Sequence, residues 1–409
     1  MHIGILGRWL FCFIKGGEGI RYIKKDGKKW AAFFLALCIF CGTAVVCSAK
    51  TADAVPVVSA QSAILVNADD GSVLWAKNAA QKRPMASTTK IMTALLTLET
   101  AACKDRVVDI TADMVRVEGS SMGLRAGDRL SLSGLAAGML STSGNDAATA
   151  AAYALAGSPA AFVQKMNQRA QELKMTNTHF ATPSGLDDSQ HYSTAEDMAK
   201  LACAAMKNAS FAAITAQKTI QVHFVQPDCT QTFTNHNKLL SMYNGCIGVK
   251  TGFTKKAGRC FVSCAQRNGV RLVAVTLSAP DDWKDHQIML DYGFSQLRSV
   301  PIDDSAYSVS LPLVGGSKEA VQVHGMAGST VVIPKDANLN RSVQLPHFLY
   351  APLDKEEPVG TVQYCYGGKV VAQTVLTAQK ESAAPPQESS VWQKICSFFS
   401  SLAESLFAS

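Results

Sequence analysis

Charge is scarce in this 409-residue chain, and long hydrophobic runs are nearly absent. Only 17% of the residues are charged and 47% are hydrophobic, whereas a typical globular protein carries about 25% charged residues. A chain disordered throughout and a coiled coil are excluded, because both need far more charge or polarity. Residues 30–46 are the one apolar run of spanning length, which excludes a membrane protein with several spans. The length predicts two or three domains.

A basic excess is also missing from most of the chain. Residues 1–49 hold +5 of the net charge of +7, whereas a nucleic-acid-binding protein concentrates basic residues on its folded domain. We therefore expect no nucleic-acid partner. The basic residues at 21–29, the apolar run 30–46 and the small residues Cys47 and Ala49 form the pattern of an export signal cleaved after Ala49. An uncleaved anchor is the alternative, and in both cases the remainder lies outside the cytoplasm, in the cell wall space.

The chain lacks the usual patterns of metal sites. Four of its 12 cysteines precede Lys50, and the other eight contain neither a C-x-x-C pair nor a histidine cluster at metal-ligand spacing. We expect no metal and no cofactor, and mainly free thiols. Cys260 and Cys264 lie four apart in an expected strand, so both would face the same side as small buried hydrophobic residues.

The pattern of elements predicts an α+β fold for residues 59–295. Runs at 63–67 and 72–76 flank a turn sequence and predict a hairpin. A helix is expected after Ser87, and small-residue helices fill 132–155 and end at Gly157. Ser158 and Pro159 are an N-cap and first residue for the next helix. Runs at 261–265 and 270–277 predict neighbouring strands. Strands at both ends with helices between them indicate α+β.

The residues after 295 show a different pattern of elements. Short β-rich runs over 296–378 predict a small all-β domain, and residues 379–390, with two prolines, predict a linker. Within 391–407 the apolar positions 391, 395, 398, 402 and 406 follow helical spacing. This amphipathic helix has no evident core to bury it, so we expect it to lie in the plane of a membrane surface. The alternative is that it packs back on the β domain.

Three short motifs carry the chemistry. They are Ser87 with Lys90 (S-x-x-K), Ser143-Gly-Asn145, and Lys250-Thr251-Gly252 (K-T-G). By chance a chain of this length holds about one S-x-x-K and about 0.1 K-T-G, but all three in this order, each in a suitable element, form a specific set.

The spacing explains how the set would act. Residues three apart share a helix face, so Lys90 can reach the hydroxyl of Ser87. A helix N-terminus and burial beside Lys250 would lower the pKa of Lys90. Neutral Lys90 would then take the proton from Ser87, the task that histidine performs in other serine enzymes. The strand at 250–254 would align an extended peptide.

These motifs, with further blocks such as 84–93, 118–122, 191–198 and 235–240, resemble the low-molecular-mass penicillin-binding proteins, the serine-type D-alanyl-D-alanine carboxypeptidases. The resemblance implies a transpeptidase-type domain of an antiparallel sheet with helices on both sides. It implies that Ser87 attacks the penultimate D-alanine of a peptidoglycan stem peptide and that β-lactams acylate the same serine. The resemblance also implies that Lys90 is the base and that Ser143, with Lys250, passes a proton to the leaving amine. It implies that Asn145 binds the substrate amide and that Thr251 and Thr254 bind the terminal carboxylate. The backbone N–H groups of Ser87 and of Phe253, which follows the K-T-G glycine Gly252, would form the oxyanion hole.

Two alternatives stay open. A DD-endopeptidase that cleaves cross-links would use the same residues, and a catalytically weak wall-binding protein would keep only the fold. The sequence leaves the oligomeric state undecided. The acidic pairs Asp281-Asp282 and Asp303-Asp304 are interpreted as loop acids rather than a catalytic pair or a Ca²⁺ site.

Overall fold

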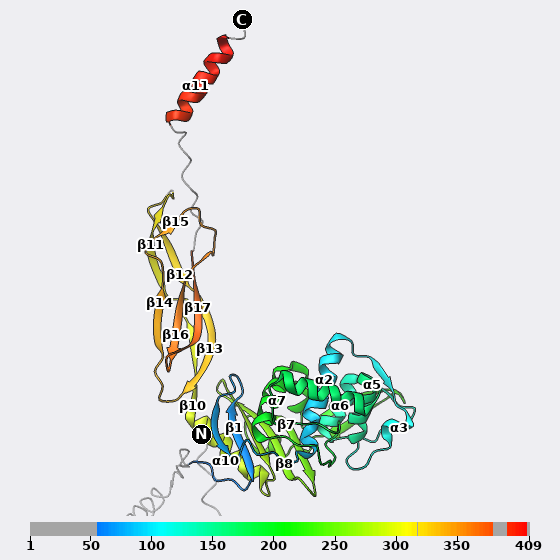
Figure 1. Ribbon diagram of the computed structural model, residues 1–409. Coiled ribbons are helices and arrows are strands. Elements are labelled where there is room, and N and C mark those ends of the chain that lie inside the picture. The colour runs from blue at the N-terminus through cyan, green and yellow to red at the C-terminus, as the bar shows by residue number, and fades with distance from the viewer. Residues whose placement is uncertain (1–54, 317, 379–390, 407–409) are drawn as a thin grey trace, which may run out of the picture. The chain divides into compact units, whose positions relative to one another are not determined.

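A computed structural model describes residues 55–316, 318–378 and 391–406 (Figure 1). The predicted export signal (1–49) and the predicted linker (379–390) lie outside the described residues. The described chain folds as a mixed helix-and-sheet domain, followed by a β-rich domain and a helix.

An antiparallel sheet forms the centre of the first domain. Its strands run in the order β2-β1-β9-β8-β7. The bounds are β1 Ser62–Asn67, β2 Val73–Lys77, β7 Cys246–Thr254, β8 Gly258–Arg267 and β9 Val270–Leu277. The predicted hairpin is confirmed, since Ala63 pairs with Lys77 and Leu65 with Trp75. β7, which carries the K-T-G motif, is the last strand in the order and leaves one side unpaired within this sheet.

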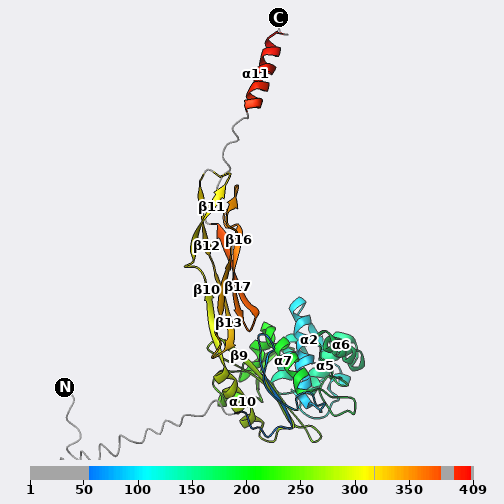
Figure 2. The ribbon, with the colours of Figure 1, turned by 60° about the vertical axis from the view of Figure 1, so that its left-hand side comes forward.

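Helices cover both faces of this sheet (Figures 1 and 2). On one face α10 (Asp282–Gln296) packs on β8 and β9; on the other α7 (Ala195–Lys207) packs on β9 and β1. Separate apolar clusters fill the two interfaces. Cys260 and Cys264 are both buried on the α7 side, as expected, and the eight cysteines of the described residues are free thiols.

A mainly helical region completes the domain. Its helices are the 3₁₀ helix η1 Ala86–Thr89, α2 Lys90–Cys103, α3 Ala112–Val115, α4 Leu132–Ser141, α5 Asn145–Ala156, α6 Pro159–Glu172, α8 Ala209–Thr215 and α9 Leu239–Met242. A second sheet has the order β3-β4-β5-β6, with bounds Val107–Asp109, Arg129–Ser131, Thr219–Gln226 and Cys229–Thr234. The α5–α6 connection follows the sequence prediction: Gly157 is left-handed at φ 77° and the hydroxyl of Ser158 caps α6, which begins at Pro159.

Strands dominate the second domain. A sheet of order β14-β16-β17-β12-β11-β15 accompanies the pair β10-β13. The bounds are β10 Leu297–Asp303, β11 Ser308–Val314, β12 Ala320–Gly325, β13 Ala327–Pro334, β14 Asn340–Gln344, β15 Leu349–Tyr350, β16 Pro358–Tyr366 and β17 Lys369–Ala378. Helices are absent from the described part of 297–378, in agreement with the predicted all-β composition.

One acid of this domain is buried. Asp304 lies in the connection between β10 and β11, as expected of a loop acid, but only 4% of it is exposed. Its carboxylate accepts hydrogen bonds from Arg341, Tyr364 and Thr374. These partners lie on β14, β16 and β17, so a single buried acid joins three strands.

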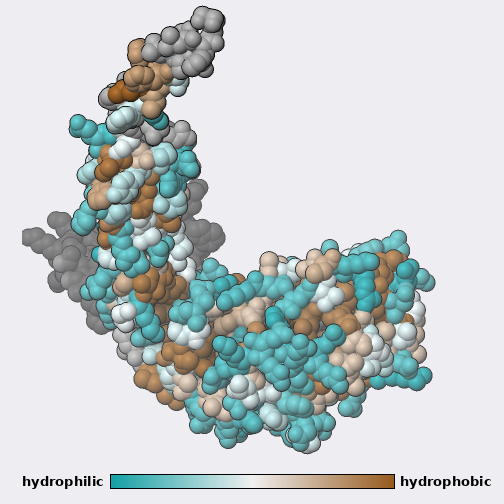
Figure 3. Space-filling view, turned by 45° about the horizontal axis from the view of Figure 1, so that its top comes forward, coloured by the Kyte–Doolittle hydropathy of each residue, from teal (hydrophilic) through white to brown (hydrophobic). Residues whose placement is uncertain are grey.

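The last described element is α11, Val391–Leu406. Its side chains Trp392, Phe398 and Phe399 are exposed, and hydrophobic surface is visible on this helix, whereas polar side chains cover much of the visible face of the first domain (Figure 3). The helices of the described residues are all too short or too polar to cross a membrane.

Candidate active site

Ser87 lies at a tight turn that leads into α2. It is the second residue of η1, and Lys90 is the first residue of α2. The preceding residue, Ala86, has a left-handed φ of 47°, a conformation that is uncommon for a residue with a side chain. This turn leaves Ser87 half-buried, whereas Lys90 is fully buried.

The amine of Lys90 contacts three fixed oxygens. Its Nζ lies 2.9 Å from the hydroxyl oxygen of Ser87, 2.6 Å from Asn145 Oδ1 and 2.6 Å from the carbonyl oxygen of Ser184. A neutral amine has two N–H donors and one lone pair. The two carbonyl oxygens can take both donors, which directs the lone pair toward Ser87. The contacts therefore suit a base that receives the hydroxyl proton.

The electrostatic surroundings favour this neutral form. Burial lowers the pKa of Lys90 well below its ordinary value, and the nearby charge of Lys250 lowers it further, while Asp146 acts in the opposite direction. Burial also lowers the pKa of Lys250 to about 7. Desolvation is the largest of these causes, and Lys90 is the first residue of α2, at the helix N-terminus expected from the sequence.

The middle motif lies between two helices rather than within one. Ser143, expected in a helical region, is instead in the connection from α4 to α5, with a left-handed φ of 64°. Asn145 begins α5, and its amide joins two groups: Oδ1 accepts from Lys90, and Nδ2 donates to the Glu118 carbonyl at 2.6 Å. The motif thereby places a rigid amide beside the base.

The K-T-G strand runs against the serine turn. A side chain at Gly252 would bring its Cβ within 2.9 Å of the Ser87 nitrogen, so only glycine allows this approach of β7. Lys250 is buried, and its Nζ donates to the Thr251 carbonyl at 2.9 Å. The side chain of Phe253 is exposed and does not pack in the core, so its backbone N–H is the group considered for the oxyanion hole.

A cavity of about 340 Å³ opens beside Ser87. The expected residues Ser143, Thr251, Gly252 and Phe253 line it. Six further residues, none of them among the expected site residues, also line the cavity: Ser120, His236, Lys238, Arg259, Asp282 and Trp283.

The interpretation of Asp282 as a loop acid is wrong. Asp282 is buried in the first turn of α10 rather than in a loop, and it accepts from Arg259 Nε at 2.9 Å and pairs with Nη2 at 2.7 Å. The guanidinium of Arg259 also lies 5.6 Å from the centre of the Trp283 ring. The cavity therefore has a fixed cation on one wall.

Four expected site residues do not line the cavity: the buried Lys90, Asn145 and Lys250, and Thr254. Thr254 has polar partners of its own. Its hydroxyl donates to the carboxylate of Asp187 at 2.8 Å and accepts from the Ala257 N–H at 3.0 Å. A carboxylate neighbour repels a second carboxylate. Thr251, which lines the cavity, is therefore the better placed of the two threonines for the terminal carboxylate of a substrate.

Two further groups near Lys90 and Asn145 lie outside the three motifs. Asp146 is buried and accepts from the backbone N–H groups of Met122, Gly123 and Leu124 at 3.0 Å each. The Ser184 carbonyl comes from a loop almost one hundred residues after Lys90 in the chain. An aspartate in the first turn of a helix is a sequence signal for Asp146, but a backbone carbonyl has none.

The fold and the site define a class: a serine enzyme in which a buried lysine lies against the nucleophilic hydroxyl. Comparison with known sequences narrows the class. The D-alanyl-D-alanine carboxypeptidase family matches residues 49–281, and the C-terminal domain family of penicillin-binding protein 5 matches residues 303–383. The chain belongs to the D-alanyl-D-alanine carboxypeptidase family.

Individual relatives agree with this assignment. The chain is 31% identical to the D-alanyl-D-alanine carboxypeptidase DacF of Bacillus subtilis, over 79% of this chain and 85% of that protein. It is 36% identical to DacB2 of Mycobacterium tuberculosis, over 59% of this chain and 84% of that protein.

Solved structures show the same fold. Penicillin-binding protein 5 of Haemophilus influenzae matches with a TM-score of 0.60 and 28% identity, over 81% of this chain and 99% of that one. The Streptomyces K15 DD-transpeptidase matches with a TM-score of 0.56 and 32% identity, over 59% of this chain and 99% of that one. The protein is a serine-type D-Ala-D-Ala carboxypeptidase, as the sequence analysis predicted.

Proposed function

We propose that this enzyme removes the terminal D-alanine from peptidoglycan stem pentapeptides through an ester on Ser87. The observation that carries the proposal is the environment of Lys90: a fully buried amine, 2.9 Å from the Ser87 hydroxyl, with two carbonyl oxygens ready to accept both of its protons. This arrangement supplies a base without histidine.

Acylation begins at the Ser87 hydroxyl. Ser87 Oγ attacks the carbonyl carbon of the penultimate D-alanine while Lys90 Nζ takes the hydroxyl proton. The carbonyl oxygen becomes an oxyanion, for which we assign the N–H groups of Ser87 and Phe253; one such donor typically contributes about 2.7–4 kcal/mol. The C–N bond then breaks, and the proton that Lys90 received passes through Ser143, with Lys250 beside it, to the leaving amine, so that Lys90 is neutral again. Free D-alanine departs.

Deacylation reverses the roles. Water gives a proton to Lys90 and its oxygen attacks the ester carbonyl, and the Ser87 hydroxyl is restored as the shortened peptide leaves. A β-lactam enters by the same attack, with the ring amide in place of the peptide bond. The family assignment supports both substrates.

The cavity walls suggest how the terminal carboxylate is held. Thr251 lines the cavity, whereas the Thr254 hydroxyl is engaged by Asp187. Lys238 places a cationic side chain on the same cavity, whereas the guanidinium of Arg259 is already paired with Asp282. We therefore assign carboxylate binding to Thr251 with Lys238. Asn145 would contact the substrate amide.

The site of action is outside the cytoplasm. The export signal at 1–49 directs the chain across the membrane, and the exposed aromatic side chains of α11 suit an interface between water and lipid. We propose that α11 holds the enzyme at the outer face of the cytoplasmic membrane.

The direct test uses a pentapeptide ending in D-Ala-D-Ala, with released D-alanine as the measurement and a fluorescent penicillin as a label for the serine. Ser87→Ala should abolish both release and labelling. Thr100→Ala, an exposed hydroxyl at the far end of α2, is the matched control and should keep both. Labelling that survives Ser87→Ala would refute the nucleophile.

The same assay separates the endopeptidase alternative. A cross-linked muropeptide dimer offered to the wild type would release monomers if the enzyme were an endopeptidase. Release of D-alanine from the pentapeptide with an intact dimer supports the carboxypeptidase. A catalytically weak wall-binding protein would do neither.

A further inference from the structure

The loop at residues 179–192 reaches the base and the nucleophile turn from outside the sequence motifs. Its Ser184 carbonyl accepts from Lys90 Nζ, and its Pro183 carbonyl accepts from Thr93 Oγ1, both at 2.6 Å. Gly185 packs directly on the Ala86 carbonyl, where an added Cβ would lie 2.0 Å from the oxygen. The position of this loop therefore sets one of the three contacts of the base.

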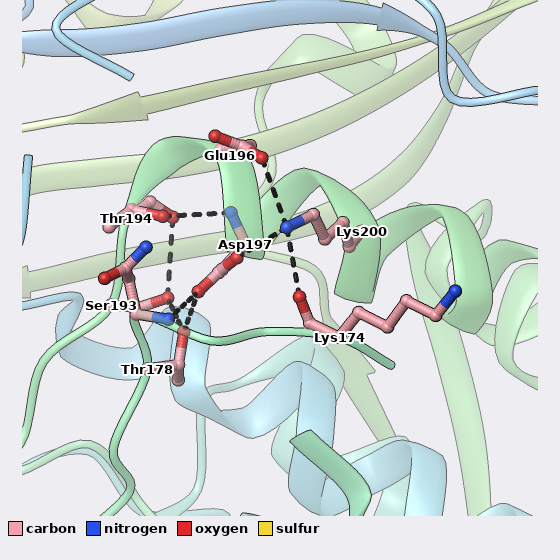
Figure 4. A network of polar contacts seen from close by, with 8 residues as sticks. Lys174, Thr178, Ser193, Thr194, Glu196, Asp197 and Lys200 are labelled. Carbon is pink, nitrogen blue, oxygen red and sulfur yellow. Dashed lines mark hydrogen bonds and ion pairs between the residues drawn. The ribbon is translucent and has the colours of Figure 1, made fainter. Parts of the chain in front are cut away.

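The base of the loop is rigid. The backbones of His179 and Tyr192 pair with each other at 2.9 and 3.1 Å. Beyond this pair, buried Asp197 accepts from Thr178 Oγ1 and from Lys200 Nζ, both at 2.9 Å (Figure 4). These contacts fix where the loop begins and ends, but they lie away from Ser184. The inner part contacts Thr93 through the Pro183 carbonyl and the Ala86 carbonyl through Gly185. A side-chain hydrogen bond from the loop to the serine turn adds to these contacts.

His191 supplies that contact. It is only 4% exposed, and its Nδ1 accepts from the Ala181 N–H at 2.9 Å. Because Nδ1 is an acceptor, the proton of the neutral ring lies on Nε2. Nε2 then donates to Thr89 Oγ1 at 2.7 Å. The Thr89 hydroxyl in turn donates a hydrogen bond, at 2.8 Å, to the carbonyl of Ala86, the residue before Ser87.

The surroundings keep this ring neutral. Burial is the largest influence and lowers the pKa of His191 to about 4. Asp188 and Asp187 act in the opposite direction, while His179 and Lys90 add to the lowering. The hydrogen-bond directions above therefore hold throughout the neutral pH range.

We propose that His191 is a positioning residue for acylation, because it ties the inner part of the 179–192 loop to the turn that carries Ser87 and so holds the Ser184 carbonyl against Lys90. It does not contact the reacting atoms. The proposal rests on the proposed function, in which Lys90 is the base. Loss of the link lets the carbonyl and the serine turn move apart, and displacements of about 1 Å typically cost about 100-fold in rate.

The experiment uses the full chain with two substitutions of matched buried histidines. His191→Phe keeps the ring, which packs against Phe180 at 6.0 Å, but removes both polar atoms. We expect kcat for D-alanine release and the rate of acylation by fluorescent penicillin to fall about 10- to 100-fold, with KM unchanged. His191→Gln keeps a donor and an acceptor and should restore part of the rate.

His286 is the control. It is also fully buried between two hydroxyls, Ser263 at 2.6 Å and Thr276 at 3.0 Å, but it lies on α10, on the other face of the sheet. His286→Phe should lower the melting temperature as His191→Phe does, yet leave the acylation rate at the wild-type value. A merely structural role for His191 predicts the same rate in both variants and would overturn the proposal.

Two further measurements keep the test decisive. If His191→Phe does not fold, Thr89→Val cuts the same link from the other end and should show the same loss of kcat. Where both fold, the double variant should be no slower than either single one, because the two act through one link; additive losses would contradict it. A wild type that is labelled by penicillin but releases no D-alanine would refute the proposed substrate, while the acylation rates would still decide the role of His191.

Discussion

At the scale of single residues, the site depends on two buried lysines with different tasks. In the proposed mechanism Lys90 must be neutral to take a proton, and Lys250 must be charged to help Ser143 pass a proton to the leaving amine. Burial lowers the pKa of both, and the charge of Lys250 lowers that of Lys90 further. Repulsion between the two ammonium groups therefore helps to keep a single proton on the pair.

This arrangement predicts a bell-shaped pH profile of acylation. The rate should rise with pH as Lys90, whose pKa burial and Lys250 lower well below its ordinary value, loses its proton, and it should fall as Lys250 loses its proton around pH 7. Lys250→Arg should remove the alkaline limb, because a guanidinium keeps its charge throughout the accessible pH range. Acylation by a fluorescent penicillin between pH 4 and pH 10 measures this, with Lys218→Arg, an exposed residue, as control. An unchanged alkaline limb in Lys250→Arg would assign it to another group.

At the scale of elements, glycines permit backbone contacts that the motifs alone do not reveal. Gly252 lets β7 approach the Ser87 nitrogen, and Gly185 lets the 179–192 loop approach the Ala86 carbonyl. Both therefore bring a segment against the same turn. In the β domain a buried carboxylate rather than a glycine brings segments together, since Asp304 accepts hydrogen bonds from side chains on β14, β16 and β17.

The β domain offers a stability prediction with an internal control. Asp304→Ala should lower the free energy of unfolding of this domain by about 1–3 kcal/mol, because it leaves the buried Thr374 hydroxyl without its acceptor. The neighbouring Asp303→Ala is exposed and should change it by less than about 0.5 kcal/mol. Denaturant unfolding followed by circular dichroism measures both. Acylation of Ser87 should be unaffected in either variant, so equal stabilities would contradict the assigned role of Asp304.

At the scale of the whole molecule, the chain joins a catalytic domain, a β domain and a terminal helix. The first two match separate families, so the catalytic chemistry is contained within one segment of the chain. The helix α11 adds exposed aromatic side chains to a chain whose other described helices form a folded domain.

The membrane proposal is tested at this scale. Deletion of residues 391–409 should release active enzyme into the soluble fraction. The triple change of Trp392, Phe398 and Phe399 to serine should weaken binding to phospholipid vesicles at least about 100-fold, since each apolar side chain contributes about 1.5–3 kcal/mol. Sedimentation with vesicles measures the partition, and D-alanine release confirms an intact site. Unchanged binding of both variants would favour packing of the helix on protein instead.

Much of this could be predicted from the sequence because the information was local. Spacing of three placed Lys90 beside Ser87, and a glycine followed by serine and proline marked the boundary between α5 and α6. The order of the three motifs identified the family. The burial of Asp282 and Asp304 was not predicted, because burial depends on distant partners: Asp282 meets Arg259 and Asp304 meets Arg341 only in the folded chain.

The sequence by itself determined the scarcity of charge, the absence of metal-site patterns and the identity of the nucleophile motif. Only the tertiary structure decided which groups surround Lys90. The Ser184 carbonyl is a backbone atom without a side-chain signature, and His191 reaches Thr89 across 102 residues. Backbone atoms and long-range contacts leave no local pattern in a chain, because they arise when folding brings distant segments together.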